Sequence, residues 1–81
     1  MNSWCVYIIL CMKDDTYYTG ITNNIDKRIE THNAGKGSRY TRARLPVKLI
    51  RLFPVSNKSE ALKLEYRIKQ MSRLDKLQFT Q

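Results

Sequence analysis

The segment Trp4–Met12 is apolar on both of the faces that a β-strand would present. A strand of this kind must be covered on both sides, which favours a central position in a sheet over an edge. The polar residues Lys13, Asp14 and Asp15 follow it. Thr16–Thr22 is then a second segment rich in Tyr, Thr and Ile, residue types that favour strands. We therefore expect an antiparallel hairpin with a two-residue turn at Asp14-Asp15.

Capping residues and apolar periodicity predict three helices and one further strand downstream of this hairpin. We expect a helix over Ile25–Asn33 after an Asn24 cap, a loop over Ala34–Pro46, a strand over Val47–Phe53, a helix from an Asn57 cap to about Met71, and a short last helix after a Ser72 cap. No internal repeat or linker interrupts the 81 residues. The sequence therefore predicts one α+β domain over residues 1–81, with the order β-β-α-β-α-α.

The charge balance of the chain favours a polyanionic partner. Fifteen Lys and Arg residues against seven Asp and Glu residues give a formal net charge of +8 and an isoelectric point near 9.8. In a chain this short, such a balance indicates nucleic acid. A membrane surface is the weaker interpretation, because no segment combines a basic face with a long apolar one. No apolar run approaches the roughly 20 residues of a spanning helix either.

The two cysteines favour a reduced, cytoplasmic protein. Cys5 and Cys11 lie in one expected strand, roughly 20 Å apart, so they cannot form a disulfide with each other. Two Cys and one His are also too few, at no recognised spacing, for a zinc site. The apolar segment Trp4–Met12 lacks a basic start and a small-residue cleavage site, so we do not interpret it as a signal peptide.

Tyr7 and Tyr18 are expected on the same face of the hairpin. Pairing about Asp14-Asp15 makes the numbers of opposed residues add up to 29, and any odd sum gives the two tyrosines a common face. A β-bulge would bring them closer together. Each tyrosine taken alone is most simply a core residue whose hydroxyl finds a hydrogen-bond partner.

One side of the expected helix Ile25–Asn33 carries two polar side chains beside two apolar ones. Arg28 can extend from the helix edge into water, or it can hold a phosphate oxygen and stabilise transition-state charge. His32 is more often a satisfied boundary histidine, but beside Arg28 it is a candidate for positioning a phosphate or a nucleophile. The residues that share this side are Ile25, Arg28, Ile29 and His32.

Elimination among the acidic residues leaves Glu65. The others are assigned to the turn, to the outer face of the first helix, or to caps: Asp14, Asp15, Asp26, Glu30, Glu60 and Asp75. Glu65 lies at the edge of the apolar stripe of its helix, where helix geometry alone favours an ion pair with Lys69 at i, i+4. Alternatively, a lone carboxylate near the core can bind one Mg²⁺, with waters and a substrate phosphate as the other ligands. A two-metal site needs clustered acids, which the sequence does not offer.

The loop Ala34–Pro46 is strongly basic. Such a loop is more often a solvated surface than a segment that recognises specific bases, but its charge suits contact with a nucleic-acid backbone. The candidate nucleic-acid-binding residues are Lys36, Arg39, Tyr40, Arg42 and Arg44.

Taken together, these positions resemble the GIY-YIG nuclease family, and in particular its small stand-alone bacterial branch. Cys5-Val6-Tyr7 represents the first triplet, with Cys in place of Gly, and Tyr18-Thr19-Gly20 represents the second. Arg28 follows Gly20 by eight residues, and Glu65 is on the last long helix. Further matching stretches are Tyr18–Thr22, His32-Asn33, Gly35–Arg42 and Ser59–Leu62.

The resemblance implies a three-stranded antiparallel sheet flanked by helices, and an endonuclease that hydrolyses DNA phosphodiester bonds with a divalent metal. It implies that Glu65 binds a single Mg²⁺ or Mn²⁺ ion and that Arg28 holds the scissile phosphate. Tyr7 or Tyr18 would align or deprotonate the attacking water, with help from His32. A tyrosine pKa near 10 is too high for an effective base at pH 7 unless the metal or Arg28 lowers it.

The identity of the substrate and of any partner stays open at this point. The DNA could be branched or otherwise structured, and an unidentified protein partner could supply specificity. A non-catalytic nucleic-acid-binding module would keep the fold and the charge without cutting. A basic RNA-associated protein needs only the charge and leaves the spacing of the Tyr, Arg and Glu residues unexplained.

Overall fold

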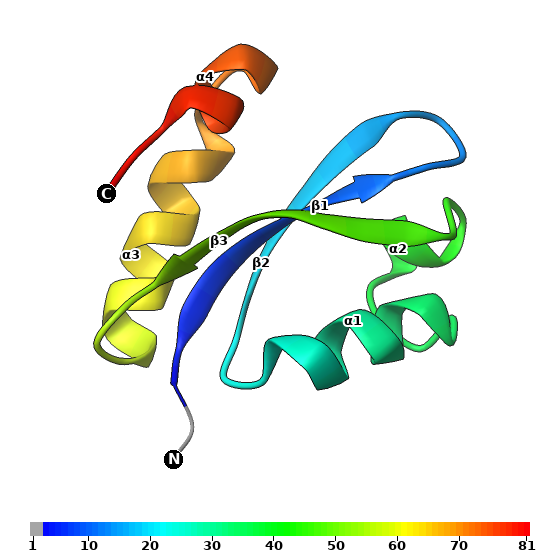
Figure 1. Ribbon diagram of the computed structural model, residues 1–81, viewed down its shortest axis with the longest axis horizontal. Coiled ribbons are helices and arrows are strands. Elements are labelled where there is room, and N and C mark those ends of the chain that lie inside the picture. The colour runs from blue at the N-terminus through cyan, green and yellow to red at the C-terminus, as the bar shows by residue number, and fades with distance from the viewer. Residues whose placement is uncertain (1–2) are drawn as a thin grey trace.

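The computed structural model describes residues 3–81, which form three strands and four helices (Figure 1). The strands make one antiparallel sheet in the order β2-β1-β3, so the first strand is central as predicted. The expected β-β-α-β-α-α order is confirmed, with one short helix added between the first long helix and the third strand. The elements are β1 Cys5–Cys11, β2 Thr16–Thr22, α1 Ile25–Asn33, α2 Arg39–Arg42, β3 Val47–Pro54, α3 Lys58–Lys69 and α4 Arg73–Gln78.

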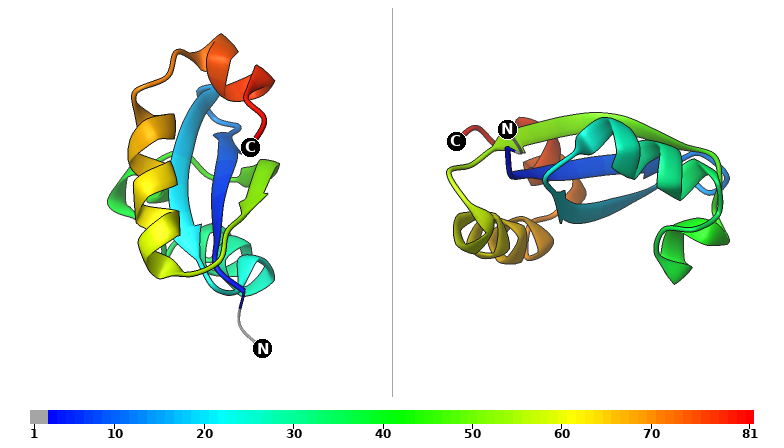
Figure 2. Two further views of the ribbon diagram at one scale, coloured as in Figure 1. Left: turned by 90° about the vertical axis from the view of Figure 1, so that its left-hand side faces the viewer. Right: turned by 90° about the horizontal axis from the view of Figure 1, so that it is seen from below.

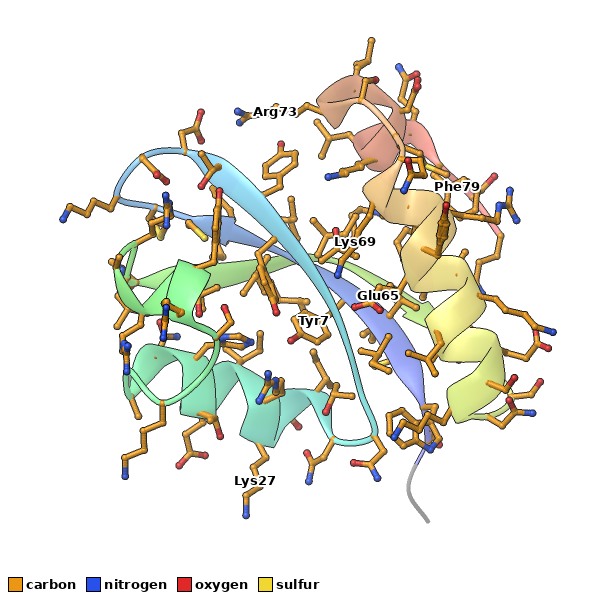
Figure 3. The ribbon with its side chains drawn as sticks, turned by 180° about the vertical axis from the view of Figure 1, so that it is seen from behind. Tyr7, Lys27, Glu65, Lys69, Arg73 and Phe79 are labelled. Atoms are coloured by element: carbon orange, nitrogen blue, oxygen red, sulfur yellow. The ribbon has the colours of Figure 1, made fainter. Side chains whose placement is uncertain are left out.

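Strand β1 is covered on both faces, as its apolar sequence predicts. Val6 and Ile8 belong to one buried cluster, which they form with residues of β3 and α3. Tyr7 and Ile9 belong to a second cluster on the opposite face, which α1 covers. Figure 1 accordingly shows α3 and α4 on one side of the sheet and α1 and α2 on the other. The edge strand β2 therefore lies between the two groups of helices, and Figure 3 shows the molecule from this edge.

The hairpin turn is longer than the predicted one. Tyr7 lies opposite Gly20, so opposed positions add up to 27 instead of 29, and the turn covers Met12–Asp15. Asp15 has a positive φ of 59° and donates its N–H to the carbonyl of the last β1 residue. Its carboxylate is paired at 3.0 Å with Arg73, a residue at the far end of the chain. The prediction of a two-residue turn was wrong, because the observed turn is stabilised in part by this contact with a residue far away in the sequence.

The predicted helix caps are confirmed. The side chains of Asn24, Asn57 and Ser72 each accept a hydrogen bond from a backbone N–H in the first turn of α1, α3 and α4. A fourth cap, Ser38, begins α2 inside the segment that we expected to be loop throughout. Helix α3 ends at Lys69, slightly before the expected boundary.

Arg51 of β3 attaches the C-terminal segment to the sheet. Its guanidinium donates hydrogen bonds to the carbonyls of Lys76, Leu77 and Phe79, which are among the last acceptors of α4 and its cap. The Phe79 ring then packs edge-on against a phenylalanine of β3 at 5.5 Å between centroids. Figure 2 (left) shows the segment after α4 returning toward the end of β3. None of the helices in the described residues is long and apolar enough to cross a bilayer.

Candidate active site at the edge of strand β2

Gly20 opens a path for the Tyr7 side chain toward the edge of the sheet. The two residues lie directly opposite each other on β1 and β2, so their side-chain positions share one face. A Cβ atom at position 20 would lie 2.5 Å from Tyr7 Oη and 2.6 Å from Cζ. Glycine is therefore required by close approach, and it lets the Tyr7 hydroxyl extend across β2.

Helix α1 brings two polar side chains to this hydroxyl. Arg28 Nε donates a hydrogen bond to Tyr7 Oη at 3.2 Å, and His32 Nε2 lies 3.0 Å from the same oxygen. Arg28 and His32 are one turn apart on the inward side of α1, as the helical periodicity predicts. Asn33 fixes the end of this helix by exchanging two hydrogen bonds with the backbone of Val47 in β3.

His32 is fully buried and bonded through both ring nitrogens. Its Nδ1 atom lies 2.8 Å from Thr41 Oγ1 in α2, and the Thr41 hydroxyl also donates toward the carbonyl of Ser38. A Cβ atom at Gly37 would lie 2.2 Å from Nδ1, so only glycine leaves room for the ring. Sequence reasoning missed Gly37, Ser38 and Thr41, although all three lie in the stretch that resembles the family.

Burial sets the protonation states of this network. Burial raises the pKa of the Tyr7 hydroxyl, while the hydrogen bond and the charge of Arg28 oppose that rise. Burial also lowers the pKa of His32, and the nearby Arg28 charge lowers it further. At neutral pH, Tyr7 is therefore protonated and His32 is neutral. Because the Thr41 hydroxyl donates to the Ser38 carbonyl, its oxygen is left to accept a hydrogen bond from His32. This arrangement favours the His32 tautomer with the proton on Nδ1. His32 Nε2 then accepts a hydrogen bond from the Tyr7 hydroxyl.

Tyr18 lies on the same face as Tyr7, because the observed register sum is also odd. The two ring centroids are 6.5 Å apart without any bulge between β1 and β2. Tyr18 also packs edge-on against His32 at 5.6 Å and stacks on Tyr40 at 6.0 Å. In the part of the chain that the structure describes, its hydroxyl has no hydrogen-bond partner. The two tyrosines thus differ: one is bonded within the site, and the other is a half-buried ring beside it.

Tyr40 and Arg44 belong to one stack of side chains at the surface, in which Tyr40 is 37% exposed. The Arg44 guanidinium lies 3.9 Å from the Tyr40 ring centre, on a ring that Tyr18 already contacts. Arg44 Nε is also paired with Asp14 at 2.8 Å. The other three predicted nucleic-acid-binding residues, Lys36, Arg39 and Arg42, are exposed in and before α2.

Glu65 approaches the same edge from the other side of the sheet. Figure 3 shows Glu65 on α3 and Tyr7 on either side of β2. The Glu65 carboxylate is near enough to add a small upward contribution to the pKa of Tyr7, after burial as the main cause. The predicted ion pair with Lys69 is present at 3.3 Å, with the two side chains 19% and 51% exposed.

The donor set at this edge fits a weakly held Mg²⁺ ion. Within residues 3–81, no group of three or more His, Cys, Asp or Glu side chains could chelate a metal. Glu65 is therefore the one carboxylate at this edge that could hold such an ion. Mg²⁺ commonly keeps several waters and binds through one or two carboxylates together with substrate phosphates. One carboxylate near an arginine that could hold a substrate phosphate would meet that requirement.

Comparison with known proteins identifies the family of this chain. The model of the GIY-YIG catalytic domain matches residues 3–78. A UPF0213 protein of Bacillus cereus is 49% identical over 80 residues, which cover 99% of this chain and 82% of the relative. The solution NMR structure of the UPF0213 protein of Bacillus halodurans is 45% identical, with a TM-score of 0.56 over 96% of this chain and 81% of that one. A solution NMR structure of a protein from E. faecalis is 36% identical, with a TM-score of 0.65 over 96% of this chain and 82% of that one. The chain belongs to the GIY-YIG family.

Proposed function

We propose that this protein is an endonuclease that hydrolyses DNA phosphodiester bonds with the help of one divalent metal ion. The observation that carries the proposal is the hydrogen-bonded group of Tyr7, Arg28 and His32 at the β2 edge, with the Glu65 carboxylate across the strand. A purely structural arrangement would not need a buried tyrosine hydroxyl bonded to both an arginine and a neutral histidine. Perturbed titratable groups that converge at an edge are typical of catalytic sites.

The three residues would divide the chemistry between binding and proton transfer. Arg28 uses Nε to hold Tyr7, so its two terminal nitrogens can hold two oxygens of the scissile phosphate. Tyr7 has no exposed surface in the free protein, so the attacking water would reach Oη from the Arg28 side when the substrate binds. Tyr7 Oη would then accept a proton from this water while its own proton passes to His32 Nε2. The P–O bond to the leaving strand then breaks. Thr41 assists by keeping the other His32 nitrogen protonated.

Glu65 would hold the metal, and Lys69 would then lose its partner. When bound, a divalent metal stabilises the charge that develops on the phosphate and on the leaving oxygen. Magnesium and manganese are both suited to an oxygen ligand set of this kind. Two observations support a metal here: the position of the Glu65 carboxylate, and the common use of divalent ions by members of the family.

DNA is the substrate that the charge distribution favours. Lys36, Arg39 and Arg42 add exposed positive charge on the α2 side of the site, where a phosphate backbone can follow them. A non-catalytic binding module is the alternative, because it would use the same surface. The buried thiols of Cys5 and Cys11, both free, also fit the reducing cytoplasm.

The test is a cleavage assay with Mg²⁺ or Mn²⁺ on duplex, single-stranded, flap and branched DNA, and on RNA of the same sequence. Glu65→Gln should lower the cleavage rate by about 10²-fold or more while leaving binding intact. Glu30→Gln, on the exposed outer face of α1, is the matched control and should keep full activity. DNA binding without cleavage of any substrate would favour the binding module, and cleavage that Glu65→Gln does not change would remove Glu65 from the site.

A further inference from the structure

A shallow hollow of about 310 Å³ lies beside the proposed active site. It lies where the end of β2, the start of α1 and the start of α3 meet. A larger hollow of about 480 Å³, between α3 and the C-terminal segment, contains none of the proposed catalytic residues. The smaller one shares Arg28 with the site, and its lining is Trp4, Ile21, Thr22, Asn23, Arg28 and Lys58.

Two basic side chains in this hollow have no acidic partner among the described residues. Arg28 donates Nε–H to Tyr7, and no other residue in the described part of the chain bonds or pairs with its terminal nitrogens. Lys58 has no acidic partner within residues 3–81, and its Nζ lies 5.6 Å from the centre of the Trp4 ring. The lining contains no acidic residue. The hollow therefore suits an anion, and Arg28 at its border links that anion to the scissile phosphate.

Trp4 adds an aromatic surface to the same hollow. The indole is half-buried: it packs against the core cluster under α3 and also lines the hollow. Aromatic side chains in basic grooves are typical stacking platforms for bases, and they bind bases of any sequence. A base inside a duplex is already stacked on both faces, so only an unpaired base can use an indole in this way.

We propose that this hollow is a subsite for one unpaired nucleotide next to the scissile phosphate, which rests on the proposed function. Lys58 binds the phosphate of that nucleotide while Arg28, at the border of the hollow, holds the scissile phosphate. The base of the nucleotide then takes the place of Lys58 against the Trp4 indole. The small size of the hollow fits one nucleotide and no longer segment. The protein should accordingly prefer single-stranded, flap or frayed DNA to continuous duplex.

The experiment uses Trp4 itself as the reporter, because it is the only tryptophan in the chain. Short oligothymidylate is titrated into the intact protein in the presence of EDTA, and Trp4 emission is recorded beside the anisotropy of a labelled strand. Unpaired DNA should quench the emission in parallel with the rise in anisotropy, and a matched duplex should quench it much less. Binding seen by anisotropy without any quenching would overturn the subsite but leave the proposed function standing. No binding of any DNA would overturn both.

A matched pair of variants tests the phosphate contact. Lys58→Gln should weaken oligothymidylate binding several-fold and reduce the slope of log Kd against log salt concentration by about 0.7, the value for one contact on a single strand. Lys63→Gln is the control, because Lys63 is exposed on the opposite flank of α3 and lies near Glu60. Because both lysines are exposed, neither variant should change the thermal unfolding temperature. Equal slopes for the two variants would overturn the contact.

Discussion

Replacing Tyr7 by phenylalanine removes one hydroxyl group and leaves the ring in place. That hydroxyl is bonded to His32 Nε2 at 3.0 Å and accepts from Arg28 Nε at 3.2 Å. His32 has no exposed surface, so water cannot replace the lost donor. Leaving a buried polar group unsatisfied costs about 1–3 kcal/mol. In a domain of this size, the melting temperature should fall by about 4 to 24 °C.

Tyr18→Phe is the matched control. The Tyr18 hydroxyl has no hydrogen-bond partner among the residues that the structure describes, and its ring contacts survive the change. The free energy of unfolding should therefore stay within about 0.5 kcal/mol of the wild type. The same pair separates the tyrosines in catalysis. Tyr7→Phe should lower cleavage by about 10²-fold or more, as expected for loss of a group that transfers protons, and Tyr18→Phe should retain most of the activity.

Two measurements decide the outcome. Urea unfolding followed by circular dichroism gives the difference in stability between the two variants. The ¹⁵N resonances of His32, the only histidine in the chain, report the hydrogen bond directly. In Tyr7→Phe the Nε2 resonance should shift, while Nδ1 should stay protonated and hydrogen-bonded to Thr41 Oγ1. If Tyr7→Phe is as stable as Tyr18→Phe and the Nε2 resonance does not move, the buried network is not what holds this site together.

Four further predictions rest on individual residues. Burial lowers the pKa of His32, so at pH values below its ordinary pKa of about 6.5 the unfolded chain binds more protons than the folded protein. The free energy of unfolding should therefore fall as the pH drops from 7 to 5, and equal urea midpoints at the two pH values would contradict this. Gly20→Ala places a methyl group 2.5 Å from Tyr7 Oη and should cost about 1–3 kcal/mol in urea unfolding, whereas a fully stable variant would show that the strands can separate freely. Arg39→Ala or Arg42→Ala should each reduce the salt slope of duplex DNA binding by about 0.9, and unchanged slopes would remove α2 from the interface. Arg44→Ala should instead lower stability, measured by thermal unfolding, because Arg44 is held by Asp14 and Tyr40.

The strands and long helices were predictable because their signals are local. The apolar run around Tyr7 required a central strand, and the helical period placed Arg28 and His32 on one side of α1. The shared face of the tyrosines was predicted even though the turn was wrong. Side-chain direction depends only on whether the register sum is odd, and both 27 and 29 are odd.

The environment of His32 could not be predicted, because it depends on contacts between separate segments. Thr41 comes from α2, whose four residues are too few to show a helical period. Gly37 has a role only because the imidazole ring lies against its backbone, and its φ angle is not one that requires glycine. A glycine that is needed for space leaves no conformational signature in the sequence. Only a resemblance or a structure can identify it.

The two interpretations of Glu65 are compatible with each other. An ion pair with Lys69 was the structural alternative to a metal ligand, and the pair is present at 3.3 Å. Lys69 is much more exposed than Glu65, so the lysine can move into solvent while the carboxylate stays at the edge of the core. A partly exposed pair of this kind contributes at most about 1 kcal/mol, which is too little to keep a divalent ion from the carboxylate. Gly20 bears on the same proposal, because an edge strand without a side chain at that point leaves the Tyr7 hydroxyl room over β2. In the proposed site, this is where groups from opposite faces of the sheet would act on one phosphate.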